Sequence, residues 1–119
     1  MTMAPSRPPR LDALGEFEQS LLLAIVHLGD GAYGVTIRRE IERRTGYDVA
    51  LGAIYTSLGR LERKGLVTSR FSDPLPERGG RARRYFTLQP AGARALRESR
   101  RRLSAMWHGL ESDLRRTRS

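Results

Sequence analysis

The chain has 119 residues, a net charge of +9, a sequence pI near 11.3 and 39% apolar residues, which fits one small folded domain whose surface attracts polyanions. It contains no cysteine, so a disulfide scaffold, a thiolate zinc site and a cysteine nucleophile are excluded. The sequence has no apolar run near the roughly 20 residues of a membrane span and no hydrophobic secretory signal at its start, so we expect a cytoplasmic protein without membrane contact.

The N-terminal region divides into a polar arm and an apolar helix. Residues 1–12 are rich in Pro and Arg and show no periodicity, so we expect a flexible basic arm. The segment Glu16–Leu28 is predicted to be a helix that is apolar almost all the way round. Such a helix must be covered on more than one side, and a chain of this size has little core to do so. We therefore expect a homodimer whose interface includes Phe17, Leu21 and Ile25.

Gly29-Asp30-Gly31-Ala32-Tyr33-Gly34 matches the pattern G-x-G-x-x-G of dinucleotide-binding loops. That pattern requires a preceding strand and a βαβ unit, whereas a helix precedes it here. We interpret it as a helix end and a turn into a second helix, roughly Gly34–Thr45. The turn Gly46–Asp48 follows, and two helices joined by a short glycine-containing turn indicate a helix-turn-helix.

The stretch Val49–Val67 contains the predicted recognition helix, which ends at Gly65 before Leu66 and Val67 begin a β-branched run. Leu51, Ile54, Leu58 and Leu61 recur at steps of three and four, which lines one helix face. The other face is small, hydroxylic or cationic, as suits the major groove of DNA. Its candidate DNA-binding residues are Gly52, Ala53, Tyr55, Thr56, Ser57, Arg60, Arg63 and Lys64; of these, we expect Ala53, Thr56, Ser57 and Arg60 to read bases and Arg63 and Lys64 to hold phosphates.

A basic hairpin is predicted after the recognition helix. Leu66–Phe71 and Arg83–Leu88 have the composition of strands, and a hairpin in this position is the wing of a winged helix. The alternative is an ordinary mobile loop with scattered charge. Wing residues expected to bind DNA are Arg78, Gly79, Gly80, Arg81 and Arg83, with arginines favoured where a minor groove is narrow. Tyr33 is a further candidate, although Tyr33 and Tyr55 could each pack the ring in the core and point the hydroxyl at the backbone.

The segment from Pro90 onward is predicted to be a final helix with a dimer seam. Pro90 suits a first helical turn. Residues spaced by sevens form an a/d seam over about three heptads, interrupted by one arginine, which favours pairing with another helix. We expect residues 90–119 to be a dimerisation helix packed on the partner's first helix, weakened at Gly109 by about 1 kcal/mol relative to Ala. The series are Ala93, Arg100, Trp107 and Leu114, and Leu96, Leu103 and Leu110; Leu96, Leu103, Trp107, Leu110 and Leu114 are assigned to the interface.

These motifs together resemble the PadR-type transcriptional regulators. The resemblance covers about residues 14–115 and implies a winged helix of the short form, with a single C-terminal dimerisation helix, that represses by occluding a promoter. Some PadR-like proteins accept flat aromatic or hydrophobic compounds near the dimer interface, which makes Met106 and Trp107 a possible ligand site. The alternative is that Trp107 only fills the seam. Ala50 and Gln89 depart from the family pattern. The matching segments are Ala32-Tyr33-Gly34, Gly52-Ala53-Ile54-Tyr55, Arg60-Leu61-Glu62, Lys64-Gly65-Leu66-Val67, Arg78-Gly79-Gly80-Arg81 and Arg84-Tyr85-Phe86-x-Leu88-x-Pro90-x-Gly92.

The resulting prediction is a mainly α protein with a small β-wing, a winged helix-turn-helix over residues 13–89 and a dimerisation helix over residues 90–119. As a homodimer it would bind a palindromic double-stranded DNA operator. His27 and His108 have no partners typical of an enzyme or a metal site, so we expect neither activity nor cofactor. Alternatives are a multiple-antibiotic-resistance-type regulator, a sequence-independent basic nucleic-acid-binding protein, and a protein-interaction module.

Overall fold

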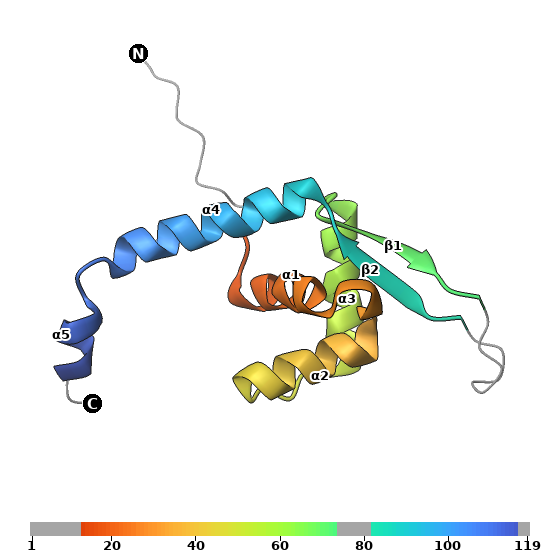
Figure 1. Cartoon of the computed structure of the whole chain (residues 1–119), viewed down its shortest axis with the longest axis horizontal. Coiled ribbons are helices and arrows are strands. Elements are labelled where there is room, and N and C mark those ends of the chain that lie inside the picture. The colour runs from red at the N-terminus through yellow and green to blue at the C-terminus, as the bar shows by residue number, and fades with distance from the viewer. Residues whose placement is uncertain (1–12, 74–81, 117–119) are drawn as a thin grey trace, which may run out of the picture.

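The computed structural model describes residues 13–73 and 82–116 and has the predicted winged-helix architecture. Three helices and a hairpin form the body, and α4 runs past α1 and projects away on the side opposite the hairpin, with α5 at its far end (Figure 1). The predicted arm, residues 1–12, lies outside the described residues. The elements are α1 (Glu16–Leu28), α2 (Gly34–Thr45), α3 (Leu51–Arg63), β1 (Val67–Phe71), β2 (Arg84–Leu88), α4 (Pro90–Trp107) and α5 (Glu111–Arg116).

The ends of the first three helices follow from local sequence. Gly46 ends α2 with a φ of +81°, and its N–H donates to the carbonyl of Glu42. Gly65 follows α3 with a φ of +80°. Both angles lie in the left-handed region, where glycine has no Cβ penalty. The predicted spans of α1 and α2 are confirmed, as is the turn after α1, where Gly29–Gly31 forms one 3-10 turn.

The hairpin is antiparallel and joins the helical core through its inner end. Val67 pairs with Leu88 and Phe71 with Arg84 at the two ends of the ladder. The sheet has two strands, and one isolated β-bridge joins Tyr33 to Tyr85 of β2. Both predicted strands are therefore confirmed, and β2 lies between β1 and the residues that open α2.

The core corrects the predicted role of α1. Leu21 and Ile25 are 0% and 3% exposed within the single chain, so the prediction that they form a dimer interface is wrong. Phe17 is partly buried and also packs against the core. The apolar residues that α1 leaves exposed are instead Leu23 and Val26. In an all-round apolar helix the pattern cannot say which side faces the domain's own core.

The C-terminal segment is two helices, so the predicted single helix over residues 90–119 is wrong. The α4 helix ends at Trp107, and Gly109 has a φ of +80°. The backbone leaves the helix at His108, whose ψ is 120°, and the positive φ of Gly109 is incompatible with a continued right-handed helix. The seven-residue spacing therefore holds along α4 up to Trp107, whereas Leu114 lies on α5. Leu103, Leu110 and Leu114 all remain exposed.

One close contact joins α4 to the body. The N–H of Gln89 donates to the carbonyl of Leu66 at 2.9 Å. Gly92 is buried on the first turn of α4, where a Cβ would lie 2.3 Å from that same carbonyl oxygen. A larger residue at this position would push α4 away from the junction between α3 and β1.

We predict that Gly92→Ala lowers the free energy of unfolding by about 1–3 kcal/mol, because the added methyl group overpacks the junction. Urea denaturation measures this change. Gly52→Ala is the control, since its Cβ would meet nothing within 4 Å and Ala favours the helix by up to about 1 kcal/mol. Equal losses in the two variants would contradict the role of the close contact.

Candidate nucleic-acid interface

The α3 helix has one face in the core and one face turned outward. Ile54, Leu58 and Leu61 are all 0% exposed. Positions 52, 56, 59 and 63 follow one another by steps of four, three and four, so they share the opposite face. We call this row the outward stripe; it consists of Gly52, Thr56, Gly59 and Arg63.

Two of the four residues of the outward stripe are glycines and have no side chain. A Cβ at Gly52 would meet nothing within 4 Å, and one at Gly59 would meet only the Arg63 guanidinium, at 3.6 Å. Packing therefore does not require glycine at either position. Glycine costs about 1 kcal/mol relative to Ala inside a helix, so its presence at exposed Gly52 and half-buried Gly59 favours a close approach to this backbone over a packing role.

Two residues predicted to read bases lie elsewhere. Ser57 is buried at 5% exposure, and its Oγ accepts a hydrogen bond from Arg60 Nη2 at 3.2 Å. The prediction that Ser57 contacts bases is therefore wrong for this conformation. A small hydroxyl residue fits either a core edge or a DNA face, so its type could not decide between them. Ala53 and Thr56 are exposed, as predicted residues of a binding face must be.

Arg60 and Lys64 lie on the flank of α3 that faces α1. The carboxylate of Glu18 is 3.8 Å from Arg60 Nε and 3.6 Å from Lys64 Nζ. These distances describe loose ion pairs, and Glu18 also accepts a hydrogen bond from the N–H of Gly15. To reach DNA, either cation must leave Glu18. Glu18 is a contact that the sequence analysis did not identify.

Aromatic side chains fix the start of α2 beside the wing. The rings of Tyr33 and Tyr85 meet edge to face, with centroids 5.3 Å apart. The guanidinium of Arg83 lies 4.4 Å from the centre of the Tyr33 ring, and that of Arg70 lies 5.0 Å from the centre of the Tyr85 ring. Each contact has the geometry of a cation–π interaction. This places two arginines on one face of the hairpin next to the helix-turn-helix.

Arg70 was not among the predicted site residues. It lies two positions after Thr68 in β1, so the two side chains share an exposed strand face, and this spacing was the signal for it. Tyr55 packs its ring over the backbone of Gly34, where a Cβ would lie 2.3 Å from the tyrosine hydroxyl. It is therefore a packed residue with an exposed edge, 38% accessible.

The predicted wing residues Arg78, Gly79, Gly80 and Arg81 lie outside the described residues.

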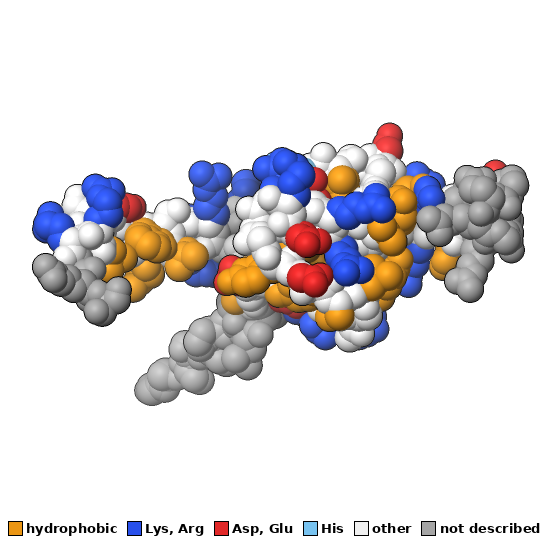
Figure 2. Space-filling view, turned by 90° about the horizontal axis from the view of Figure 1, so that it is seen from below, with side chains coloured by type: hydrophobic (Ala, Val, Ile, Leu, Met, Phe, Trp, Pro, Cys, Tyr) orange, Lys and Arg blue, Asp and Glu red, His pale blue; other side chains and the backbone are white. Residues whose placement is uncertain are grey.

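Some basic residues are locally neutralised. The Glu40 carboxylate accepts hydrogen bonds from Arg44 and from Arg43, and the pKa of Glu40 is lowered, chiefly by the Arg44 hydrogen bond. On α4, hydrogen bonding to Arg101 is likewise the main cause that lowers the pKa of Glu98. The face shown in Figure 2 nevertheless carries basic side chains over the body and on the C-terminal arm, and fewer acidic ones.

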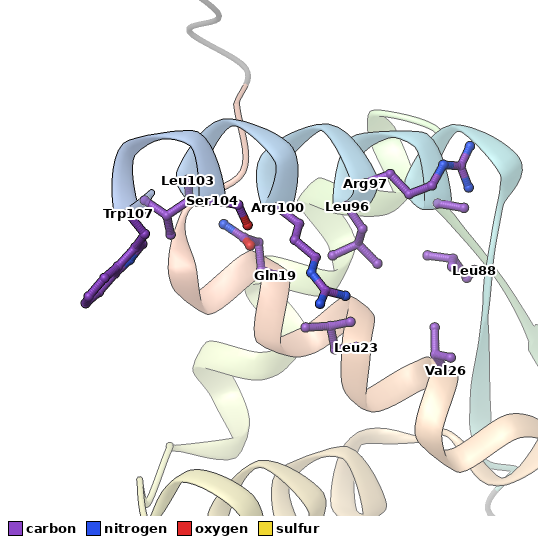
Figure 3. Close-up of a pocket in the computed structure, with 11 residues that line it drawn as sticks. Gln19, Leu23, Val26, Leu88, Leu96, Arg97, Arg100, Leu103, Ser104 and Trp107 are labelled. Atoms are coloured by element: carbon purple, nitrogen blue, oxygen red, sulfur yellow. The ribbon is translucent and has the colours of Figure 1, made fainter. Parts of the chain in front are cut away.

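A groove of about 660 Å³ lies between α1 and α4. Leu23 and Val26 of α1 face Leu96 and Leu103 of α4 across it, while Arg100 points from α4 toward α1 and Trp107 lies at one end (Figure 3). Arg100, which interrupts the apolar seam in the sequence, is thus part of the groove. Met106 lies outside the groove and is 73% exposed, so only Trp107 of the predicted ligand pair is placed there.

Other kinds of site have little support in the part of the chain that the structure describes. Residues 13–73 and 82–116 contain no group of three or more His, Cys, Asp or Glu side chains placed to hold a metal ion. No described helix is both long and apolar enough to cross a membrane.

Comparisons with known proteins agree with this geometry. The model of the transcriptional regulator PadR-like family matches residues 22–98. Transcriptional regulator Rv3488 of Mycobacterium tuberculosis is 38% identical over 96 residues, which span 76% of this chain and 83% of that protein.

Solved structures share the fold at lower identity. A PadR family transcription regulator from Clostridium difficile superposes with a TM-score of 0.66 at 24% identity, over 82% of this chain and 98% of that one. A PadR-like transcriptional regulator from Bacillus cereus gives a TM-score of 0.66 at 19% identity, over 86% and 93% of the two chains. The chain therefore belongs to the PadR-like family, whose members are winged-helix DNA-binding transcriptional regulators and not enzymes.

Proposed function

We propose that the protein is a homodimeric repressor that binds a palindromic operator through the outward stripe of α3. The observation that carries this proposal is the pairing of a fully buried inner face of α3 with an outward row of small and cationic residues, which are exposed except for the half-buried Gly59. Gly52 and Gly59 would let the helix backbone approach the floor of the major groove. Thr56 and Ala53 would then lie nearest to base edges, and Arg63 would hold a phosphate or a guanine.

The wing and the start of α2 would flank this contact. Arg83 and Arg70 are held beside Tyr33 on the same side of the hairpin, where they could hold the phosphate backbone. Arg78 and Arg81 are proposed to reach a neighbouring minor groove. Arg60 and Lys64 would contribute once DNA displaces Glu18. Occupation of a promoter by such a dimer would exclude RNA polymerase, so repression is the proposed outcome.

The groove between α1 and α4 supports the dimer. Leu23 and Val26 are 47% and 55% exposed in the single chain, and Leu103 and Trp107 are 57% and 42% exposed. Apolar surface of this extent on a small domain is typical of an interaction site. We propose that α4 of a second copy packs on α1 and fills the groove, with Leu110 and Leu114 extending the contact along the C-terminal arm. Hydrophobic side chains also gather on that arm in Figure 2.

A flat aromatic effector is proposed for the same place. Trp107 lies at the end of the groove, so a compound stacked on its indole ring would also touch the helix of the partner. A ligand that binds one arrangement of the two subunits better than another would shift the spacing of the two α3 helices, and hence the affinity for DNA. Trp107 fluorescence would report such binding.

The experiment that tests the proposed function is selection of binding sites from random DNA duplexes. We expect a palindromic consensus with half-sites about one helical turn apart. Fluorescence anisotropy of the selected duplex against a scrambled one should show a preference of ~10³-fold or more near physiological salt. Equal affinities that fall together with salt would instead support the sequence-independent basic binder.

For the outward stripe, we predict opposite effects of Gly59→Ala on folding and on binding. The fold should gain up to about 1 kcal/mol from helix propensity, because the new methyl group makes only an ordinary contact with Arg63. Affinity for the selected duplex should fall about tenfold, which is about 1.4 kcal/mol, because the methyl group holds the helix away from the groove. Thermal unfolding and anisotropy measure the two effects. Unchanged affinity would remove Gly59 from the interface.

For the dimer, we predict that Leu103→Glu gives a species near 13.4 kDa in sedimentation, where the wild type sediments at twice that mass. A carboxylate at position 103 would be buried in the apolar α1–α4 groove, and even with Arg100 nearby its desolvation is too costly for the interface to survive. Ala105→Glu is the matched control, since it adds the same charge to the same helix outside the groove. A dimeric Leu103→Glu variant would refute the assignment of this interface.

A further inference from the structure

Three side chains from three elements form a network between α3 and the wing. Arg84 at the start of β2 donates from Nη2 to Glu62 Oε1 at 2.6 Å and from Nε to Ser69 Oγ at 3.0 Å. Ser69 on β1 donates its hydroxyl to the Glu62 carboxylate, at 2.9 and 3.0 Å from its two oxygens. Glu62 lies in the last turn of α3. The network therefore links the recognition helix to both strands of the hairpin.

Arg84 is also held by its packing. Its guanidinium lies 5.2 Å from the centre of the Phe86 ring and 5.8 Å from that of Phe71. Phe86 is 1% exposed, whereas Phe71 is 68% exposed. Arg84 thus sits where the hairpin leaves the core, between a buried ring and an exposed one.

The outer half of the hairpin has little apolar support on the side of α3. On this face Val67 and Phe86 are buried, but Phe71, nearer the tip, is exposed. On the opposite face the Tyr33–Tyr85 contact ties the hairpin to the start of α2. On the face toward α3, polar contacts with Glu62 take the place of apolar packing. These contacts join both strands of the hairpin to the last turn of α3.

The network is better suited to fixing geometry than to stabilising the fold. The side chains of Arg84 and Glu62 are 36% and 30% exposed, and ion pairs this accessible to water add about 0–1 kcal/mol to stability. A second hydrogen bond from the same guanidinium to Ser69 restricts the direction in which Arg84 can point. Because Arg84 is paired with Glu62, its guanidinium does not serve as a contact to a DNA phosphate.

We infer that Glu62 is a positioning residue for DNA recognition, which acts through Arg84 and Ser69 to present α3 and the wing to one DNA site at a fixed angle. The inference rests on the proposed function, in which α3 and the wing bind DNA together. A helix and a wing at a fixed angle can engage the major and the adjacent minor groove together, and the hairpin loses no conformational entropy when it binds. Because the hairpin is already held in this position in the free protein, ordering it on binding costs no binding free energy.

The test is Glu62→Ala with the selected duplex. The substitution removes a negative charge from a chain of net charge +9, and this change alone would tighten binding to DNA. A positioning role predicts the opposite result, a loss of about tenfold. Glu111→Ala on α5 is the control with the same change in charge. In a hydroxyl-radical footprint, protection of the wing-contacted sugars should be lost, while methylation protection of the guanines under α3 should remain.

The free protein supplies a readout that does not depend on DNA. The N–H of Ser72 donates to the carbonyl of Arg83 at 2.8 Å, at the outer end of the described hairpin. Hydrogen exchange at this amide should accelerate in Glu62→Ala with little change in the melting temperature. The double variant Glu62→Arg with Arg84→Glu should restore slow exchange and the wing footprint.

Each outcome has a distinct meaning. Unchanged or tighter binding with an intact wing footprint would overturn the inference. Loss of both footprints together with a lower melting temperature would show that Glu62 only supports folding, and would overturn it as well. If the wild type selected no duplex, the proposed function would fail, and exchange at Ser72 would still decide whether Glu62 holds the wing.

Discussion

Burial of one face of α3 is the constraint on which the rest of the structure depends. Ile54, Leu58 and Leu61 are inaccessible to solvent, and each such side chain contributes on the order of 1.5–3 kcal/mol by leaving water. Their 3.6-residue periodicity fixes the rotation of the helix about its axis, so the opposite row must face outward. α1, α2 and the hairpin are arranged as the cover for that inner face. The orientation of the candidate DNA-reading surface is thus determined by the core rather than by the surface residues themselves.

The same requirement gives α1 two different sides. Its inner side, with Leu21 and Ile25, completes the core around α3, and its outer side leaves Leu23 and Val26 exposed next to α4. A domain of this size cannot wrap a helix completely, since its ratio of surface to volume is high. The proposed homodimer follows from this shortage of core. The α1 helix would then connect the partner's α4 to the packing of α3, so the distance between two α3 helices would depend on how well the groove is filled.

Local sequence signals predicted the elements well and the contacts between them less well. The bounds of α1 and α2 were predictable because glycine marks the turns and apolar spacing marks the helices. Ser57 was misplaced because a small hydroxyl residue is compatible with both faces of α3. The break at Gly109 was misjudged as a local weakness, since a positive φ is visible only in the folded backbone. The pairing of Glu62 with Arg84 spans 22 positions, and no periodicity within either element indicates it.

In the proposed complex, the distribution of carboxylates would explain how so basic a chain discriminates between DNA sequences. A net charge of +9 attracts any duplex, and such attraction carries no sequence information. Around α3, Glu18 lies beside Arg60 and Lys64, and Glu62 holds Arg84. Arg63, on the outward stripe, makes no ion pair with the rest of the described chain. Cations on the flanks of α3 are thus partly neutralised, while the stripe keeps its charge. In the proposed complex, this neutralisation would weaken non-specific contacts, so the fit of the outward stripe to the major groove would contribute more to the choice of site.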